Sequence, residues 1–299
     1  MKRIIGMVLP ALMMGVLLAG CGSTEVTTTP PPAGSDTPTA ATQLKGTVKT
    51  GGSTSVEKVM LALIYQFQED NKDVKINYEA NGSGDGITNT KSGLYEIGHS
   101  SRELKTDGTE DGLTMIAYAI DGIAIVVNPA NGITNLTKAQ VKDIYTGKIK
   151  NWNQLGGADA LITVVTREAS SGTRSAFAEI IGLEKKVDGV LDESTKIVDG
   201  ATEANGTGPV QTTVAQNPNA IGYLSFSDVD PSLVKTIQFE SVEISTDTLK
   251  DSSYTLKREF YMLTKDGTTL SPEAQAFIDF VMSDAGQAIV AENKLLQVK

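Results

Sequence analysis

The sequence predicts an α/β protein with two lobes and largely parallel sheets. Its 299 residues exceed one ordinary domain and fit two lobes of usual size. Short apolar or β-branched runs, which suit buried strands, alternate with segments whose apolar residues recur at helical spacing. This alternation is typical of parallel strands joined by helices. In open sheets of this kind, ligands bind at the carboxyl ends of the strands.

The chain is acidic. Lys and Arg total 26 against 36 for Asp and Glu, so the formal charge is −10. Proteins that bind nucleic acid carry a basic face that neutralises phosphates, and this balance therefore argues against nucleic acid as a partner. Any anion bound by the protein must be held by local dipoles and a few arginines, because the field of the whole chain repels it.

The N-terminus predicts an exported protein with a lipid anchor. A basic start at Lys2 and Arg3 precedes a mostly apolar run that ends in Leu18-Ala-Gly-Cys21, so residues 1–20 are expected to be a signal peptide. Leu-Ala-Gly-Cys resembles the lipobox of bacterial lipoproteins, which implies that Cys21 is lipidated and becomes the first mature residue. An ordinary signal peptide with a chance cysteine is the alternative. No second cysteine exists, so no disulfide is expected.

The first half of the body alternates strands, Gly/Ser loops and helices. Residues 21–44 are rich in Ser, Thr and Pro and predict a flexible tether. A short strand at 46–50 leads into a Gly/Ser loop at 51–55 and then into a helix at 56–68, where apolar residues recur every three or four positions. Next come an alternating strand at 74–78, a glycine-rich loop at 81–87, a short helix at 89–93 and a loop at 97–102.

The second half repeats this alternation. Two apolar runs, 113–120 and 123–127, predict buried strands separated by Asp121-Gly122. Thr137 is expected to cap a helix at 137–144, and Ser271 before Pro272 predicts the start of a helix at 272–282. The other expected elements are a strand at 161–166, helices at 175–181 and 210–216, and strands at 220–225 and 259–263.

Arg167-Glu-Ala-Ser-Ser-Gly-Thr-Arg174 is the strongest single candidate for a site. It lies where a predicted strand passes into a helix, and the first turn of a helix has unpaired N–H groups and partial positive charge. Gly172 lets a ligand approach the backbone, Ser171 and Thr173 add hydroxyls, and Arg167 and Arg174 add planar forks that fit oxyanions. The stretch therefore suits an oxyanion. The alternative is a capped helix with surface arginines.

Four such loops follow predicted strands. They lie at 51–55, 81–87, 97–102 and 167–174. Because the carboxyl ends of parallel strands meet at one edge of a sheet, one shared anion accounts for all four loops.

The order of these motifs resembles a known family. Along the chain follow Gly52-Ser-Thr-Ser55, Gly82-Ser-Gly-Asp-Gly86, Ile97-Gly-His-Ser-Ser-Arg102, Asp121-Gly-Ile-Ala124, Gly147-Lys-Ile-Lys-Asn-Trp152, the stretch 167–174 and Ile221-Gly-Tyr223. The pattern is similar, over residues 46–299, to the phosphate-binding lipoproteins of bacterial ABC importers, the PstS family. The resemblance implies a two-lobed, type II periplasmic-binding-protein-like fold with phosphate in the inter-lobe cleft. Lobe 1 would cover 45–126 and 223–299, and lobe 2 would cover 127–222, with crossovers near 126–127 and 221–223.

The resemblance also implies a set of phosphate-binding residues. These are Ser53, Thr54, Ser55, Ser83, Ser101, Arg102, Arg167, Ser171, Gly172 and Thr173. Ser101 stands where some members have an aspartate that accepts a hydrogen bond from the protonated phosphate, which leaves Asp85 and Asp121 as candidates for that acceptor. Arg102 is expected either to contact the anion or to pair with a carboxylate of its lobe.

The function implied by the resemblance is capture of inorganic phosphate and its delivery to an ABC permease with its ATPase. The protein would be a monomer held to the outer face of the cell membrane through Cys21. The alternatives are a binder or sensor of another tetrahedral oxyanion, such as sulfate, or a serine-based phosphoester hydrolase. Ser170 or Ser171 would be the nucleophile of that enzyme and His99 its base. No Gly-x-Ser-x-Gly elbow surrounds either serine, so a binding protein without catalysis is favoured.

No metal or cofactor is expected. Cys21 is assigned to the lipid and His99 is the only histidine, so carboxylates and carbonyls would be the remaining ligands. No Asp-rich loop has the spacing that a calcium site requires, and no phosphate-binding P-loop occurs.

Overall fold

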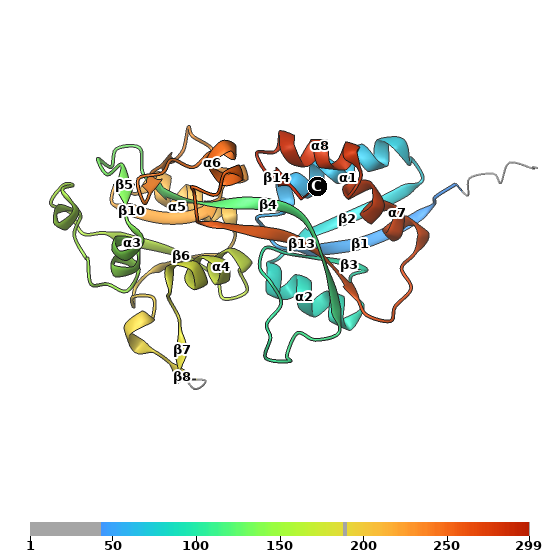
Figure 1. Ribbon diagram of the computed structural model, residues 1–299, viewed down its shortest axis with the longest axis horizontal. Coiled ribbons are helices and arrows are strands. Elements are labelled where there is room, and N and C mark those ends of the chain that lie inside the picture. Colours follow the sequence, from blue (N-terminus) through green and yellow to red (C-terminus); the bar gives the residue numbers. More distant parts are fainter. Residues whose placement is uncertain (1–42, 188–189, 299) are drawn as a thin grey trace, which may run out of the picture. The chain divides into compact units, whose positions relative to one another are not determined.

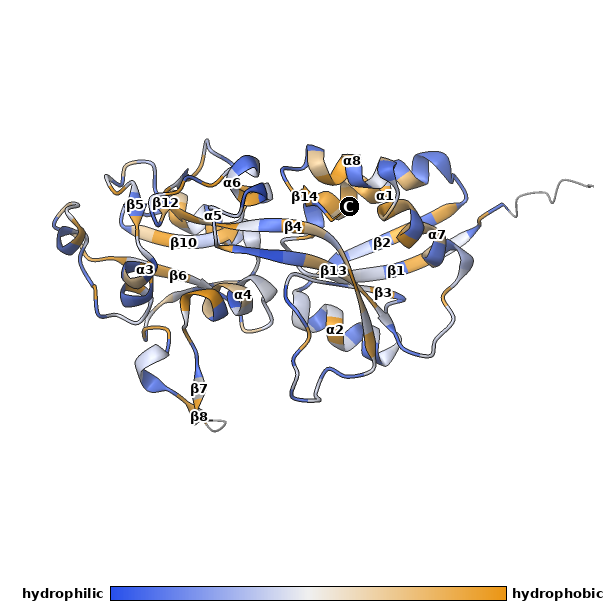
Figure 2. Ribbon diagram, viewed as in Figure 1, coloured by the Kyte–Doolittle hydropathy of each residue, from blue (hydrophilic) through white to orange (hydrophobic). Residues whose placement is uncertain are grey.

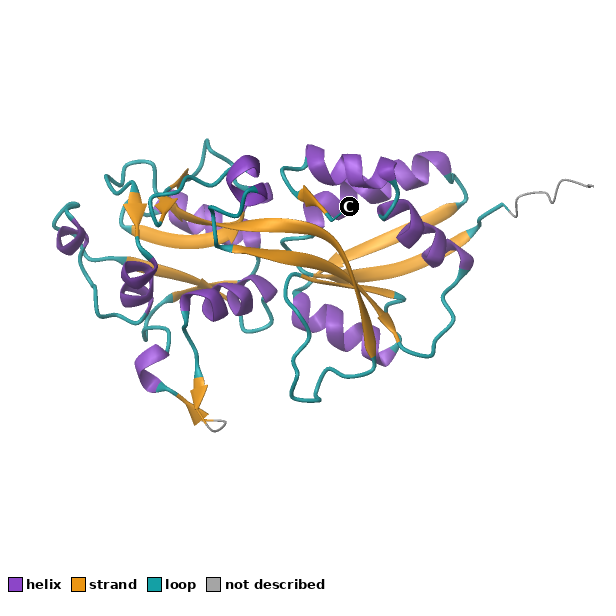
Figure 3. Ribbon diagram, in the orientation of Figure 1, coloured by secondary structure: helices purple, strands orange, loops and turns teal. Residues whose placement is uncertain are grey.

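The computed structural model describes residues 43–187 and 190–298. The predicted signal peptide, Cys21 and the predicted tether up to residue 42 lie outside the described residues. Residues 43–299 form one compact unit, in which helices cover both sides of the strands (Figures 1 and 3). Within the described ranges, no helix is long and apolar enough to cross a bilayer.

The elements confirm most of the predicted alternation of strands and helices. The strands are β1 (Gly46–Gly52), β2 (Val74–Ala80), β3 (Ile97–Ser100), β4 (Leu113–Val127), β5 (Asn135–Leu136), β6 (Thr163–Arg167), β7 (Lys186–Val187), β8 (Val190–Leu191), β9 (Thr202–Ala204), β10 (Ala220–Ser225), β11 (Lys235–Thr236), β12 (Gln238–Phe239), β13 (Lys257–Lys265) and β14 (Leu296–Gln297). The helices are α1 (Glu57–Asp70), α2 (Ser83–Ser92), α3 (Lys138–Tyr145), α4 (Gly172–Ile181), α5 (Thr207–Gln216), α6 (Thr246–Lys250), α7 (Pro272–Val281) and α8 (Asp284–Glu292). Short 3₁₀ turns are η1 (Trp152–Leu155), η2 (Glu193–Thr195) and η3 (Phe226–Asp228).

One sheet connects the whole body. Its main path runs β2-β1-β3-β13-β4-β10-β6-β9. β1 is parallel to β2 and β3, and β6 is parallel to β10 and β9. The centre is antiparallel, because β13 runs against both β3 and β4, and β10 runs against β4. The predicted parallel arrangement is therefore right for the two outer parts of the sheet and wrong for its centre.

Two separate hydrophobic cores flank this centre. The first core takes its buried side chains from 48–119 and 260–295. The second core takes them from 123–256. Figure 1 shows β4 and β13 side by side, running from one group of elements to the other. The start of β13 carries Lys257, Arg258 and Glu259 and is blue in Figure 2. Polar residues therefore lie on this strand where it passes from one core to the other.

β4 corrects the prediction of two strands separated by Asp121-Gly122. It is one strand of 15 residues. Gly122 makes no turn; a Cβ there would come within 2.8 Å of Ile244 Cδ1, so packing is what requires glycine. Asp121 is fully buried opposite Arg258 of β13, and Arg258 Nη2 donates to its Oδ2 at 2.9 Å. A polar residue in mid-strand is thus satisfied across the sheet.

The cores bear on the predicted lobe boundaries. The change from first to second core falls between Ala119 and Ile123 on β4, a few residues before the predicted boundary at 126–127. The return falls between Leu256 and Phe260, whereas the prediction placed it at 222–223. The boundaries stay a prediction, and we propose to move 223–256 into lobe 2, because the buried side chains of this segment pack in the second core.

Candidate functional site

Four helices begin at one place between the two cores, where hydrogen bonds join the residues at their starts. α1 follows β1, α2 follows β2, α4 follows β6 and α5 follows β9, so each start lies at the carboxyl end of a parallel strand. α2 begins at Ser83, well before the helix predicted at 89–93, and part of the loop predicted at 81–87 is therefore helical. Its N-cap is Gly82 with φ 110°, a conformation that glycine adopts without strain.

Three serines form a buried chain of hydroxyls on the side of the first core. Ser53 Oγ donates to Ser101 Oγ at 2.9 Å, and Ser83 Oγ lies 3.2 Å from Ser101 Oγ. The Ser101 backbone N–H also donates to Ser83 Oγ at 3.1 Å. All three residues are at most 2% exposed. Ser53 and Ser101 lie just after β1 and β3, and Ser83 is the first residue of α2 after β2. The loop predicted at 97–102 is wrong for 97–100, which form the strand β3.

Arg167 is the buried cation on the side of the second core. Only 1% of it is exposed. Its Nε and Nη2 donate to both carboxylate oxygens of Glu168, at 2.8 and 2.6 Å. Nη2 also donates to Thr54 Oγ1 at 2.9 Å, and Nη1 reaches Thr207 Oγ1 at 3.4 Å. Nη1 therefore has only a long hydrogen bond, and it is the part of the fork with most capacity left for an anion.

Glu168 fixes the orientation of this arginine. Besides its two bonds from Arg167, it accepts the backbone N–H of Gly206 at 3.1 Å. Burial raises the pKa of Glu168, but the hydrogen bonds and charge of Arg167 outweigh burial and the net pKa is lowered. The carboxylate is therefore ionised at neutral pH.

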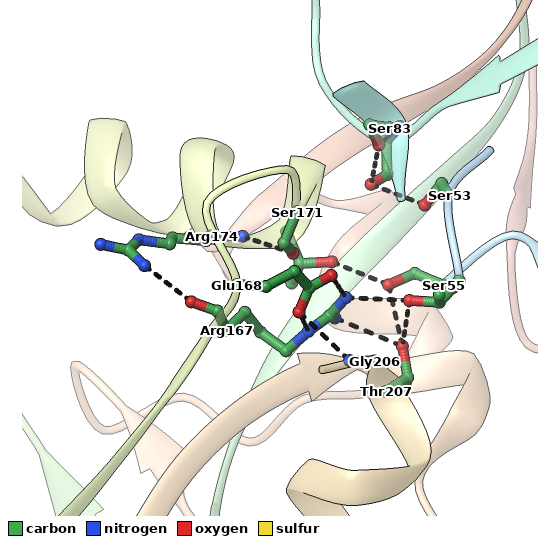
Figure 4. A network of polar contacts seen from close by, with 12 residues as sticks. Ser53, Ser55, Ser83, Arg167, Glu168, Ser171, Arg174, Gly206 and Thr207 are labelled. Carbon is green, nitrogen blue, oxygen red and sulfur yellow. Dashed lines mark hydrogen bonds and ion pairs between the residues drawn. The ribbon is translucent and has the colours of Figure 1, made fainter. Parts of the chain in front are cut away.

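The two sides of the site touch each other. Ser55 Oγ lies 2.7 Å from Thr173 Oγ1 and 3.3 Å from Thr207 Oγ1. The Gly84 backbone N–H donates to the Ser170 carbonyl at 2.9 Å. These bonds join the loops of the first core to α4 and α5 of the second, so the hydroxyls and the arginine form one cluster (Figure 4).

Gly172 lies at the closest approach between the two sides. A Cβ on this residue would come within 2.3 Å of Ser83 Oγ and 2.5 Å of Ser101 Oγ. Ser171 before it caps α4 by accepting the Arg174 backbone N–H at 3.2 Å. The predicted stretch thus caps a helix and contributes to the shared cluster, but the alternative of surface arginines is wrong for Arg167, which is buried. That the stretch binds an oxyanion stays a prediction.

Arg102 lies apart from the other predicted site residues. Its guanidinium donates to both oxygens of Glu110, at 2.8 and 2.7 Å. Burial raises the pKa of Glu110, but the bonds and charge of Arg102 lower it overall. Of the two alternatives, the structure shows the ion pair within its own lobe. The nine other predicted residues, Ser53, Thr54, Ser55, Ser83, Ser101, Arg167, Ser171, Gly172 and Thr173, lie together in the cluster or on the loops that form it.

The candidate proton acceptors are placed differently. Asp85 is exposed on the first turn of α2. Asp121 is buried and bonded to Arg258 and to Ser225 Oγ. His99, the base considered for an enzyme, is buried with Nε2 2.7 Å from Thr50 Oγ1. Burial lowers the pKa of His99 to about 3, so its imidazole is a weak base.

Thr207 and Gly206 are the site residues that the sequence argument missed. They start α5, and the predicted helix began only at residue 210. The segment before it is rich in Gly, Asn and Thr and looked like a loop. A signal was present, because Gly206 followed by Thr207 and Pro209 is a reasonable helix start.

A groove beside the cluster has a different character. It has a volume of about 460 Å³ and lies between α4 and β13. Its lining pairs three acids with three bases: Glu103, Glu179, Glu259, Arg102, Lys257 and Arg258. A balanced lining gives no preference for an anion. The cluster around Arg167 is therefore the better anion site.

Two cores joined by continuous strands, with buried donors from both meeting between them, are the architecture of a two-lobed solute-binding protein. Residues 37–285 match the model of the PBP superfamily domain. The phosphate-binding protein PstS of Borreliella burgdorferi is 31% identical over 84% of this chain and 90% of that protein. The phosphate-binding protein PstS of Bacillus subtilis is 30% identical over 99% of this chain and 94% of that protein. The chain belongs to this family, the phosphate-binding proteins PstS within the PBP superfamily.

Solved structures agree with this assignment. A Clostridium perfringens protein described as a phosphate ABC transporter substrate-binding protein, with bound phosphate, is 40% identical with a TM-score of 0.78. The match covers 85% of this chain and 100% of that one. An ABC-type phosphate transport receptor from Vibrio cholerae is 35% identical with a TM-score of 0.68, over 84% of this chain and 100% of that one.

Proposed function

We propose that this protein captures inorganic phosphate outside the cytoplasm and delivers it to the permease and ATPase of an ABC importer. The observation that carries the proposal is the buried cluster in which Arg167 and hydroxyls from both cores meet at four helix starts. Helix starts and a planar arginine fork both suit a tetrahedral oxyanion. The names of the relatives, all phosphate-binding or phosphate-transport proteins, support the same anion.

The proposed ligand contacts extend the predicted set by one residue and lose one. Phosphate would accept hydrogen bonds from Arg167 and from the hydroxyls and N–H groups around it. Thr207 joins the set because its hydroxyl contacts Arg167, and Arg102 leaves it because Glu110 occupies its fork. The proposed contacts are Ser53, Thr54, Ser55, Ser83, Ser101, Arg167, Ser171, Gly172, Thr173 and Thr207.

Hydroxyls, rather than a carboxylate, are proposed to accept the hydrogen bond that the hydroxyl of phosphate donates. Phosphate at neutral pH carries a hydroxyl that donates, whereas sulfate only accepts. The carboxylates nearby are engaged, since Glu168 is bonded to Arg167 and Asp121 to Arg258. A serine hydroxyl both donates and accepts. The chain Ser53–Ser101–Ser83 can therefore turn one lone pair toward the protonated oxygen of phosphate.

The proposal also covers the absence of catalysis, the opening of the site and the attachment to the membrane. A weak base at His99 and a serine at position 171 that caps a helix support a protein that binds without catalysis. Separation of the two cores about β4 and β13 would open the site, as in other hinge-bending proteins. A monomer tethered by lipidated Cys21 would present the closed body to the permease.

Calorimetry tests the proposal. The body, stripped of bound ligand, is titrated with phosphate and then with sulfate, and Arg167→Ala is titrated beside it. We expect one-to-one binding of phosphate, far weaker binding of sulfate and a large loss in the variant. Failure to bind either anion would overturn the assignment of the cluster to one shared site. Equal binding of both anions would favour a general oxyanion binder and remove the role proposed for the serine chain.

A further inference from the structure

A second polar cluster also joins the two cores, and none of its residues is among the proposed phosphate contacts. It contains Lys58 of α1, Asp121 of β4, Arg258 of β13, and Ser227 and Asp228 of η3. Lys58 Nζ donates to the Ser227 carbonyl at 2.7 Å. Asp121 accepts from Arg258 Nη2 and from Ser225 Oγ, each at 2.9 Å. The carboxylate of Asp121 thus has an ion-pair partner and a hydrogen-bond donor. The second carboxyl of the cluster has one oxygen without a partner among the described residues.

Asp228 carries that second carboxyl. Its Oδ2 is inaccessible to solvent and has no hydrogen-bond partner among the described residues. The charged groups facing it come from every element around it: Glu57 and Lys58 on α1, Asp121 on β4 and Arg258 on β13. Tyr78 on β2 lies in the same surroundings. Asp228 as a whole is partly exposed, but an ionised carboxylate with one oxygen enclosed and without a partner is costly, so this position favours the neutral, protonated form.

The cover over Asp228 belongs to the opposite side of the body. α1 packs in the first core, whereas the residues beside η3 pack in the second core. The Lys58–Ser227 bond therefore crosses between the two cores. α1 also begins directly after Thr54 and Ser55, which bond to Arg167, Thr173 and Thr207. An anion that draws this loop toward the second core also brings α1 over Asp228.

We propose that phosphate capture is coupled to the uptake of one proton by Asp228. The proposal rests on the proposed function, because it requires phosphate to close the two cores around the site. When the cores separate, α1 leaves η3, water reaches the enclosed oxygen Oδ2 and Asp228 ionises. When they close, α1 covers the carboxyl again and it binds a proton from solvent.

The pKa of Asp228 is shifted in the direction that proton uptake on closure requires. Burial, together with the charge of Asp121, raises the pKa of Asp228 to about 8 against the opposing effects of Lys58 and Arg258. A solvent-exposed aspartate has a pKa of about 3.9. Between these two values the closed form holds one proton more than the open form. Asp228 therefore weakens phosphate binding as the pH rises through this window, by at most about tenfold per pH unit.

Calorimetry in buffers of different ionisation enthalpy measures the protons exchanged per phosphate bound. The purified protein, Asp228→Asn and Asp230→Asn are compared at pH 7. Asp230 is the matched control, because it lies two residues away and is exposed, with its carboxyl bonded to Ser232. We expect the protein and Asp230→Asn to take up about one proton more than Asp228→Asn. The protonation of phosphate itself cancels in this difference, since all three bind the same anion.

The outcomes separate the two proposals. Equal proton counts for the protein and Asp228→Asn would overturn this inference while leaving phosphate capture intact. No binding of phosphate to the unmodified protein would overturn the proposed function instead. A measurement without any variant guards against misfolding of Asp228→Asn: NMR titration of the aspartate carboxyl carbons with and without phosphate. One midpoint must move upward by several pH units on binding; if none moves, Asp228 takes up no proton.

Discussion

The helices that begin at the site differ from those that begin elsewhere. α3, α6, α7 and α8 each start with a side-chain cap, provided by Thr137, Ser245, Ser271 and Ser283. At α1, α2 and α5 no described side chain caps the helix. A missing cap costs a helix about 1 kcal/mol. No side chain caps these three starts, so the backbone N–H groups of their first turns are not taken by a capping side chain, although the Gly84 N–H of α2 donates to the Ser170 carbonyl. Unshared N–H groups are what an anion requires of a helix start. The helices α1, α2 and α5 therefore lack the stabilisation that a side-chain cap gives to α3, α6, α7 and α8.

α4 combines both properties. Ser171 caps it through the Arg174 N–H, yet Gly172 beside it lies at the closest contact with the serines of the first core. Its start is thus fixed in position by its own cap, while those of α1, α2 and α5 depend on contacts with other loops. The following changes test how far this division holds, in order of their expected effect on phosphate affinity.

Arg167→Ala removes the only side-chain cation bonded within the cluster of described residues and shows how much affinity the uncapped helix starts supply alone. We expect a loss of about 1.5–3 kcal/mol, because the bond is charge-assisted. That corresponds to a loss of about ten- to more than a hundredfold in Kd, measured by calorimetry. Arg174→Ala is the control: it also removes an arginine from this stretch, but the Arg174 guanidinium pairs with Glu184 and Glu203 and donates to the Arg167 carbonyl, and it is not among the proposed phosphate contacts. Unchanged affinity in Arg167→Ala would mean that the helix starts bind the anion alone.

Ser171→Ala and Ser271→Ala remove matched caps, one at the site and one at α7. Each is expected to lower the free energy of unfolding by about 1 kcal/mol, measured by urea denaturation. Of these two variants, only Ser171→Ala should also weaken phosphate binding, because α4 starts at the site and α7 does not. Equal affinity in the two variants would show that the cap of α4 serves the helix alone.

Thr207→Val tests the uncapped start of α5. The change keeps the shape of the side chain and removes the hydroxyl that contacts Thr54, Ser55 and Arg167. We expect a loss of about 0.5–1.5 kcal/mol in phosphate binding. Thr213→Val on the same helix is the control, because its hydroxyl bonds to the Pro209 carbonyl and is exposed. A similar loss in both variants would point to a general effect on α5.

Arg102→Ala should have the smallest effect on affinity. Its fork is engaged by Glu110, so its removal leaves a buried carboxylate without its main partner. We expect the free energy of unfolding to fall by about 1–3 kcal/mol and the Kd to stay nearly the same. A large rise in Kd with unchanged stability would restore Arg102 to the ligand set that the sequence predicted.

The sequence was informative wherever a local pattern decides the structure. The caps at Thr137 and Ser271 follow from residue type and position, and the structure has both. The gathering of loops after β1, β2, β3 and β6 follows from the rule that parallel strands end at one edge. These features depend on near neighbours in the chain, which one sequence contains in full.

The sequence failed where distant partners decide. The sequence Asp121-Gly122 looks like a break between strands, because the residues that it contacts inside β4 are distant in the chain. Arg258 bonds to Asp121 and Ile244 packs against Gly122, and both are more than a hundred positions away. Arg102 reads equally well as ligand or ion pair until Glu110 is seen to bind it. The helix α8 was not predicted, although Ser283 before Asp284 is a usual start signal.

The arrangement of the first core has a consequence for the order in which the newly made chain can fold. β13 lies between β3 and β4 in the sheet, although the ribosome makes it long after both of them. The second core comes from one uninterrupted stretch, 123–256, whose partners are all present once that stretch has been synthesised. The first core must wait for 260–295, and until then β3 has an open edge toward β13. Folding therefore proceeds from the middle of the chain outward, and residues 260–295 complete the half that was begun first.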